Sequence, residues 1–445
     1  MKNFYFSTLK KSVVKAGLGL AFVLGANSVF AQFTAGNITV LQVGTGTGSL
    51  TNTGNPLILK EYSPFGVPTF SMAVPSTGTT SLLQSGTATS EGCLTLSPDG
   101  KFLAFGGYVT PAGGTVSLAS AASTLIPRGV GLVNMAGNYV LGASSNSFFS
   151  GNNIRGAVTS GGTGNMWGSG GVDGTDYFGS VSTPTSVQNT KTNTRAIEIF
   201  NNQLYFSTQS AAGTQTLLGI YQVGNNMPTA SGATITNIIN TTTGSQPAQF
   251  FFDATGTCYI ADQRNAVAGG IQKWVMTGPS TYSLMYTLGT GSTNVGAFGV
   301  AVLFTSSVNV VYATTTETSN NRLIAIADLG ASSSATTIAT APANTLFKGL
   351  AFSPTAMTTG INEQKSSSED VTLFPNPTSG QLHILLPKAF SQSNLEVLDV
   401  TGKAVYSITA ADRQLSLDVA ALPAGIYFVK VTSGNYSSYK KFIKD

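Results

Sequence analysis

The chain has 445 residues, of which 9% are charged, and it contains 51 glycines and one histidine, His383. Soluble domains average about 25% charged residues. So little charge excludes a helical bundle or coiled coil, and the lack of a basic stripe excludes a nucleic-acid binder. With one imidazole in the chain, catalysis by a His-based triad or by His-ligated zinc is nearly impossible.

The first 31 residues have the pattern of a secretion signal. A start with four lysines and no acid precedes the apolar run 16–26, and small residues precede Gln32. We expect cleavage between Ala31 and Gln32. The alternative is a membrane anchor, but a span needs about 20 apolar residues, and neither this run nor a later one reaches that length. The mature chain then holds 18 basic and 18 acidic residues and is formally neutral.

A short pattern recurs through residues 32–354. Each copy has a small or charged residue, an apolar run, a Gly or Asn turn and a second apolar run, which predicts two antiparallel strands per copy. Most copies start 37 to 52 residues apart, a spacing that suits four-stranded propeller blades. The copies are 91–107, 128–144, 155–171, 195–209, 247–263, 298–315 and 348–355.

Two irregularities of this series affect the blade count. The step from 128 to 155 is short for a whole blade, so part of the pattern falls inside one blade. The copy at 348–355 lacks its second strand, whereas 36–44 resembles an isolated second half. We therefore predict an all-β propeller of six or seven blades, closed by the N-terminal strand. An open β-solenoid and a decorated sandwich are the alternatives.

The first position of the copies is mostly charged. Equivalent positions on different blades would surround one level of the central channel, where converging cations suit carboxylate, sulfate or phosphate groups. The alternative is that each cation bonds backbone carbonyls of a neighbouring blade and joins the blades together. The residues concerned are Glu91, Arg128, Arg155, Arg195 and Lys348.

Two further sets of residues have an ordinary and a functional interpretation. Asp173 and Asp176 lie in a Gly-rich loop with oxygen ligands that suit calcium, although the spacing is not that of an EF-hand and such loops are usually turns. No other cofactor is expected. Cys93 and Cys258 fall in different copies, and we expect each to be buried as a small apolar residue rather than joined in a disulfide.

The composition changes near the C-terminus. Residues 355–370 are polar and without periodicity, which predicts a linker. Residues 371–445 hold more charge and several short period-two segments, which predict a small β-sandwich.

The motifs LFPNPTSGQL (373–382), VLDVTGKAV (397–405), LPAGIYFVKV (422–431) and KKFIK (440–444) resemble the type A C-terminal sorting domain of the type IX secretion system. The resemblance implies an immunoglobulin-like sandwich that engages the secretion machinery, export across the outer membrane, and processing near 361–371. The product would be released or attached to the cell surface. Residues 33–44 and 57–64 also resemble an uncharacterised family of secreted bacterial propellers. No established activity of that family can be transferred to this chain.

Two classes of function remain open. The first is a secreted or cell-surface binding module that recognises a polysaccharide or a protein through its channel mouth. The second is an extracellular polysaccharide-active enzyme, a lyase or a hydrolase, on the same scaffold. A hydrolase of the usual kind needs two carboxylates about 5–10 Å apart, and the repeat positions do not pair the acids. We therefore favour the binding module and assign no catalytic residue.

Overall fold

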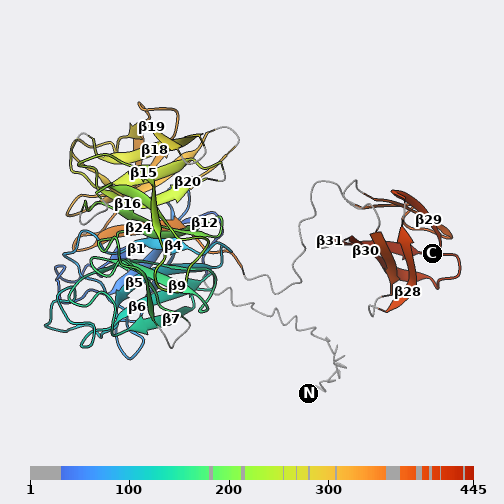
Figure 1. The fold of residues 1–445 in the computed structure, drawn as a ribbon, viewed down its shortest axis with the longest axis horizontal. Helices are drawn as coiled ribbons and strands as arrows, with labels where there is room; N and C mark the ends of the chain where they lie inside the picture. Colours follow the sequence, from blue (N-terminus) through green and yellow to red (C-terminus); the bar gives the residue numbers. More distant parts are fainter. Residues whose placement is uncertain are drawn as a thin grey trace, which may run out of the picture. The chain divides into compact units, whose positions relative to one another are not determined.

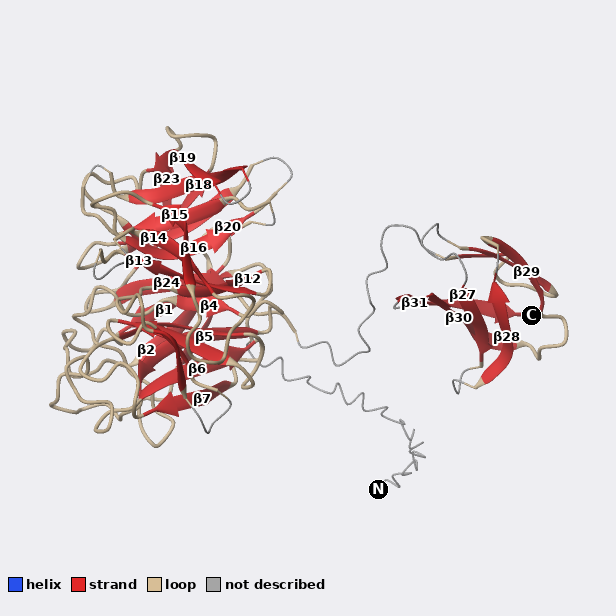
Figure 2. Cartoon of the chain, viewed as in Figure 1, coloured by secondary structure: helices blue, strands red, loops and turns tan. Residues whose placement is uncertain are grey.

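The computed structural model describes residues 32–445 except 180–183, 212–215, 254, 267, 279–280, 306–307, 357–370, 387–392, 400–402, 411 and 434–435. Every regular secondary-structure element of the described residues is a β-strand (Figure 2). No helix suited to spanning a membrane occurs in this part of the chain. The chain divides into two compact units at residues 357 and 358. The expected signal peptide and most of the expected linker lie outside the described residues.

Described residues 32–356 form six four-stranded antiparallel sheets. One sheet has the order β24 (Leu346–Phe352), β1 (Ile38–Val43), β2 (Leu57–Tyr62) and β3 (Pro68–Ala73). The next two contain β4 (Leu94–Leu96), β5 (Phe102–Tyr108), β6 (Arg128–Asn134) and β7 (Tyr139–Ser145), then β8 (Ile154–Thr159), β9 (Met166–Gly170), β10 (Thr175–Tyr177) and β11 (Thr185–Gln188).

The remaining three sheets follow the same order along the chain. The first of them contains β12 (Ile197–Phe200), β13 (Gln203–Thr208), β14 (Gly219–Val223) and β15 (Ile235–Asn240). The last two contain β16 (Pro247–Phe252), β17 (Cys258–Asp262), β18 (Gly270–Gly278) and β19 (Thr281–Leu288), then β20 (Ala297–Leu303), β21 (Val310–Thr315), β22 (Arg322–Ala327) and β23 (Ala335–Thr340).

The sheets are arranged in a closed ring. The strands β4, β8, β12, β16, β20 and β24 each contact the next one, and β24 contacts β4 in turn. These six strands are therefore the inner strands of six blades around a common axis. The prediction of an all-β propeller is confirmed, and the blade number is six.

The last blade is assembled from both ends of this unit. Its inner strand β24 pairs with β1, with Ile38 opposite Phe352 and Val40 opposite Leu350. In Figure 1 the orange β24 lies beside the blue β1. The predicted closure by the N-terminal strand is confirmed. Without β1, the inner strand β24 would have no strand to pair with and would expose an unpaired edge. Its pairing with β1 completes the sixth blade and closes the ring.

The copy at residues 128–144 does not start a blade. It forms β6 and β7, the third and fourth strands of the sheet whose inner strand is β4. Its alignment with the other copies was therefore misleading, because a hairpin of outer strands has the same apolar and turn pattern as one of inner strands. The short step from 128 to 155 is the consequence.

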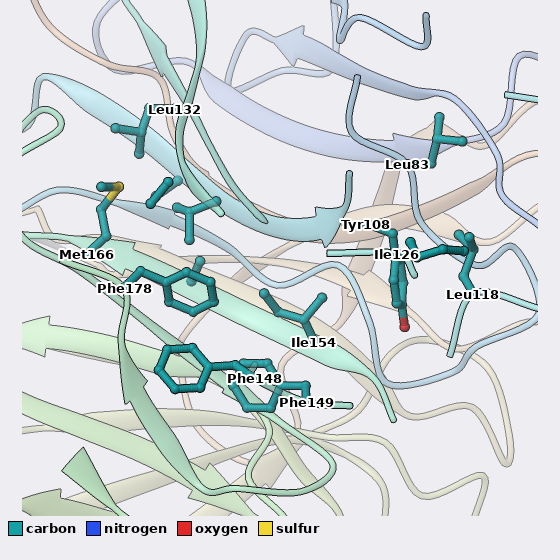
Figure 3. Close-up of a cluster of buried hydrophobic side chains, with 14 of the residues drawn as sticks. Leu83, Tyr108, Leu118, Ile126, Leu132, Phe148, Phe149, Ile154, Met166 and Phe178 are labelled. Atoms are coloured by element: carbon teal, nitrogen blue, oxygen red, sulfur yellow. The ribbon is translucent and has the colours of Figure 1, made fainter. Parts of the chain in front are cut away.

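Apolar side chains fill the space between neighbouring blades. One cluster combines Leu132 of β6, Ile154 of β8 and Met166 of β9 with Phe149 and Phe178 from the connecting loops (Figure 3). The inner strands also approach one another closely. A Cβ atom at Gly349 would lie 2.3 Å from the backbone nitrogen of Leu94, so only glycine fits where β24 meets β4.

The C-terminal unit is a two-sheet sandwich. One sheet contains β25 (Thr372–Phe374), β26 (Gln381–Leu385) and β29 (Gln414–Asp418). The other has the order β28 (Ala404–Ala410), β27 (Ser393–Leu398), β30 (Gly425–Ser433) and β31 (Tyr436–Lys444). Leu382 and Leu417 of the first sheet share a core with Val397 and Val429 of the second.

Candidate functional site

A cavity of about 500 Å³ lies at the end of the channel where the inner strands begin. Arg195 and Gln246 line it just before β12 and β16, and Phe298 and Lys348 line it from the starts of β20 and β24. The rest of its lining is mainly hydroxyl and amide groups from loops and strand ends. They belong to Thr87, Thr89, Gln209, Gln263, Asn265, Thr315, Thr316, Thr318 and Asn321.

Arg195 lines this cavity without an acidic partner. Its guanidinium contacts the Gln209 amide. With the amide turned so that its oxygen faces the guanidinium, that oxygen lies 2.6 Å from Nε and 2.7 Å from Nη1 and also contacts Nη2. It takes part in no ion pair among the described residues. Burial, and then the charge of Arg155, lower the pKa of Arg195 to about 9. An anion placed beside it would relieve both effects.

Lys348 is the second cation of the lining. Its Nζ donates to the carbonyl oxygen of Ala88 at 2.7 Å and lies 5.7 Å from the centre of the Phe298 ring. Burial lowers the pKa of Lys348 to about 8, against the opposing effect of Glu91. Its ammonium group is therefore mostly protonated at neutral pH.

Glu91 does not line the cavity. Its carboxylate is fully buried and accepts from the Tyr108 hydroxyl at 2.7 Å, from the Ser85 nitrogen at 2.9 Å and from the Asn153 amide. Burial raises the pKa of Glu91 despite these bonds. Its contacts are those of a structural residue between loops.

Arg128 occupies a different place from the one expected. It begins β6, so it is not equivalent to the other first-position residues, and the predicted ring of cations is wrong at this residue. It is fully buried, with its guanidinium 5.0 Å from the Tyr108 ring centre. Its nitrogens donate to the backbone oxygens of Ile126 at 2.6 Å, Ala121 at 2.8 Å, Asn152 at 2.9 Å and Ala119 at 3.4 Å.

Arg155 also joins blades. It lies on β8 at a register shift between Ile154 and Gly156, and it donates to the Thr194 oxygen of the next blade at 2.9 Å and to the Asn193 side chain. It is 93% buried and does not line the cavity. Of the five predicted residues, the structure thus brings Arg195 and Lys348 together at the cavity and places the other three in contacts between loops and blades.

Several polar groups of the lining were not identified from the sequence. Gln209, Gln263 and Thr315 are the last residues of three aligned copies. They lie at or directly after the C-terminal ends of β13, β17 and β21. A comparison of last positions, like that made of first positions, would have indicated them. Glu317 could not be found this way because it lies in a loop beyond the copy.

The two predicted calcium ligands differ in their surroundings. Asp173 has a positive φ of 68° and accepts from the Phe149 nitrogen at 2.7 Å. Asp176 lies on β10, and both of its carboxylate oxygens are fully buried. Burial raises its pKa to about 8. No group of three acidic, His or Cys ligands occurs in the described residues, and calcium binding stays a prediction.

Cys93 and Cys258 are both buried and free, as expected. At the expected signal cleavage site, Ala31 lies outside the described residues and Gln32 is the first residue within them.

Residues 372–445, which form the C-terminal sandwich, match the family model of the secretion system C-terminal sorting domain. The C-terminal unit is a type IX secretion sorting domain. The sorting domain implies interaction with the secretion machinery and export to the cell surface or the extracellular space. No curated protein matches the chain.

Solved structures similar to this chain share little sequence with it. One is PorZ, described as an essential surface component of the type IX secretion system of Porphyromonas gingivalis, with 13% identity, a TM-score of 0.34, and 89% of this chain and 69% of that chain covered. A second is a protein from Lactobacillus plantarum, with 10% identity, a TM-score of 0.38, and 85% and 98% covered. The extracellular region of plexin A4 has 8% identity, a TM-score of 0.36, and 93% and 53% covered.

Proposed function

We propose that the exported propeller is a binding module that holds an anionic group of an extracellular polysaccharide in the mouth cavity, with Arg195 as the main contact. The observation that carries the proposal is the guanidinium of Arg195, which lines the cavity and has no acidic partner among the described residues. A guanidinium presents several N–H donors that match carboxylate and sulfate oxygens.

The cations that do not line the cavity support this choice by contrast. Lys273 and Arg264 form ion pairs with Asp328 and Asp262. Arg128 and Arg155 donate to backbone carbonyls. Arg195 and Lys348 are therefore the cations available to a ligand in this cavity.

The rest of the lining suits a sugar. Threonine hydroxyls and Gln and Asn amides can donate to and accept from sugar hydroxyls. A volume of about 500 Å³ is within the range of small-molecule sites and fits a short saccharide segment rather than a folded partner.

No observation favours the enzymatic alternative. Glu317 is the one carboxylate among the described lining residues, and it pairs with Arg322 at 2.7 Å. The common hydrolase mechanism uses two carboxylates across the scissile bond. The binding module accounts for the lining without a further assumption.

The test measures binding of the mature chain to immobilised polyuronate, sulfated and neutral polysaccharides. Arg195→Gln removes the proposed contact. Lys60→Gln, on β2 of the closing blade, is the control for the loss of one positive charge. We expect the wild type and Lys60→Gln to bind an acidic polysaccharide, and Arg195→Gln to bind it at least about tenfold more weakly.

Equal binding by all three proteins would show that the anion lies elsewhere. Binding to neutral glycans alone would remove the role of Arg195. The absence of glycan binding would overturn the polysaccharide proposal and leave a protein partner as the ligand to be sought.

A further inference from the structure

The opposite end of the channel contains a second, smaller cavity of about 200 Å³, where β4, β12, β16 and β24 end. Its walls are strongly aromatic. Phe200 of β12, Phe251 and Phe252 of β16 and Phe352 of β24 all line it. The two cavities share no lining residue.

Gln249 separates this cavity from the first one. Along the chain it lies between Gln246, which precedes β16 and lines the first cavity, and Phe250 of β16, which lines the second. Its Nε2 donates to the carbonyl oxygens of Leu94 at 2.9 Å and Leu350 at 2.6 Å, and its Oε1 accepts from the Leu350 nitrogen at 3.3 Å. One amide thus connects the three inner strands β4, β16 and β24, and Gln249 itself lines the second cavity.

The aromatic walls support one another. The rings of Phe200 and Phe252 stack with centroids 5.1 Å apart, and those of Phe250 and Phe252 meet edge to face at 5.8 Å. Phe251 contacts Phe352 across the sheets at 6.3 Å. Such packing fixes the positions of the ring faces before any ligand arrives.

One acidic side chain lies among these rings. Glu198 of β12 lines the cavity, and it is the one ionisable residue of the described lining. Its carboxylate has no hydrogen bond and no ion pair with any described residue, in contrast to Glu91 and Glu61, whose carboxylates accept two or more bonds each. Burial raises the pKa of Glu198. Glu198 is half-buried, and a carboxylate that has only apolar neighbours on its buried side gains from a cation placed beside it.

We propose that the Glu198 cavity binds a small alkylammonium group, with the carboxylate pairing with the positive charge and the phenylalanine faces holding the alkyl substituents. The ring faces add cation–π attraction, which is strongest where water is excluded. A water molecule occupies about 30 Å³ of liquid, so the cavity has room for a group of choline size. This site is separate from the one around Arg195.

The proposal is tested by calorimetric titration of the full mature chain with choline chloride. Its neutral carbon analogue 3,3-dimethyl-1-butanol controls for shape, and sodium chloride controls for ionic strength. Glu198→Gln keeps the side-chain shape and removes the charge, while Glu396→Gln in the sorting domain is the matched control. Phe251→Leu tests the aromatic wall. Thermal unfolding of each variant establishes that it folds.

We expect choline to bind the wild type and Glu396→Gln with a Kd of about 10 mM or below, and to bind Glu198→Gln and Phe251→Leu at least about tenfold more weakly. The neutral analogue should bind as weakly to the wild type as choline does to Glu198→Gln. Equal binding of choline and the analogue would overturn the proposal, as would unchanged binding by Glu198→Gln or no binding by the wild type. Loss of glycan binding by Arg195→Gln would not affect these results.

Discussion

The hydroxyl groups of Thr39 and Ser353, 314 positions apart in the sequence, share a hydrogen bond of 2.8 Å. Thr39 lies on β1, and Ser353 follows β24. Their contact connects the first and last strands of the ring, and both side chains are buried. The stability of the whole propeller therefore depends on residues near the mature N-terminus.

The ring closure can be tested at Val40, which is fully buried between β24 and β2. We expect Val40→Ala to lower the free energy of unfolding by about 2 kcal/mol, because the substitution leaves a cavity in a core that cannot fully relax. Val67→Ala is the control, since Val67 is 60% exposed. Chemical denaturation of both variants measures the difference, and equal stabilities would contradict a closing role for β1.

Asp328 is the centre of a buried network between two blades. Its carboxylate accepts from Lys273 at 2.7 Å, Tyr259 at 2.6 Å and Tyr286 at 2.7 Å. We expect Asp328→Asn to destabilise the propeller by about 3 kcal/mol, because it leaves the ammonium group of Lys273 unpaired in a mostly buried position. The matched control is Glu396→Gln, which breaks the more exposed pair with Lys430 and should change stability much less, because solvent screens that pair.

The same network predicts a dependence on pH. Burial alone would raise the pKa of Asp328, but the hydrogen bonds from Lys273, Tyr259 and Tyr286 outweigh it and hold the pKa below its usual value. A lowered folded-state pKa stabilises the protein above the unfolded pKa and loses that contribution as pH falls through the folded one. Wild type should therefore lose stability in acid more steeply than Asp328→Asn. The same loss of stability with falling pH in both proteins would show that the Asp328 carboxylate does not cause the acid dependence.

Asp176 should have the opposite dependence. Its pKa is raised to about 8 in the fold, so the folded state binds a proton that the unfolded state releases near pH 4. The raised pKa therefore lowers the free energy of unfolding, and this loss grows as pH rises from the unfolded-state pKa to the folded-state pKa. The loss increases by at most about 1.4 kcal/mol per pH unit. Asp176→Asn should therefore stabilise the protein, and by up to about 4 kcal/mol more at pH 8 than at pH 5. Asp99→Asn is the control, and an equal gain at both pH values would contradict the buried position.

Calcium binding can be tested on the wild type and Asp176→Asn. If a cation binds at Asp176, millimolar calcium raises the melting temperature of the wild type and not that of Asp176→Asn, because a ligand stabilises only the state that binds it. An unchanged wild-type melting temperature would remove calcium from this loop.

Arg128 and Arg195 should differ in what they affect. Arg128→Gln leaves several buried carbonyl oxygens without donors, so we expect a loss of about 3 kcal/mol of stability with glycan binding unchanged in the folded protein. Arg195→Gln should lose binding with a smaller change in stability. Unfolding curves and glycan binding of both variants separate the two roles, and a shared loss of binding would return Arg128 to the site.

The sequence alone was sufficient for the architecture and the destination. Apolar runs with period two and recurring Gly turns specify strands and blades because these patterns are local. The incomplete copy at 348–355 and the isolated strand at 36–44 specified the closure, since a missing half must be supplied from elsewhere. The sorting domain was recognised because its motifs are contiguous in the chain.

The tertiary structure decided the site. Arg128 and Arg155 have the same local pattern, yet one lies on a third strand and the other at a bulge of an inner strand, and this difference exists only after the sheets form. The pairing of Arg195 with Gln209, and the isolation of Glu198 among phenylalanines, depend on which strand ends meet around the axis. Side-chain direction and burial are set by neighbouring blades, and for that physical reason one blade's sequence cannot determine which cation is free to bind.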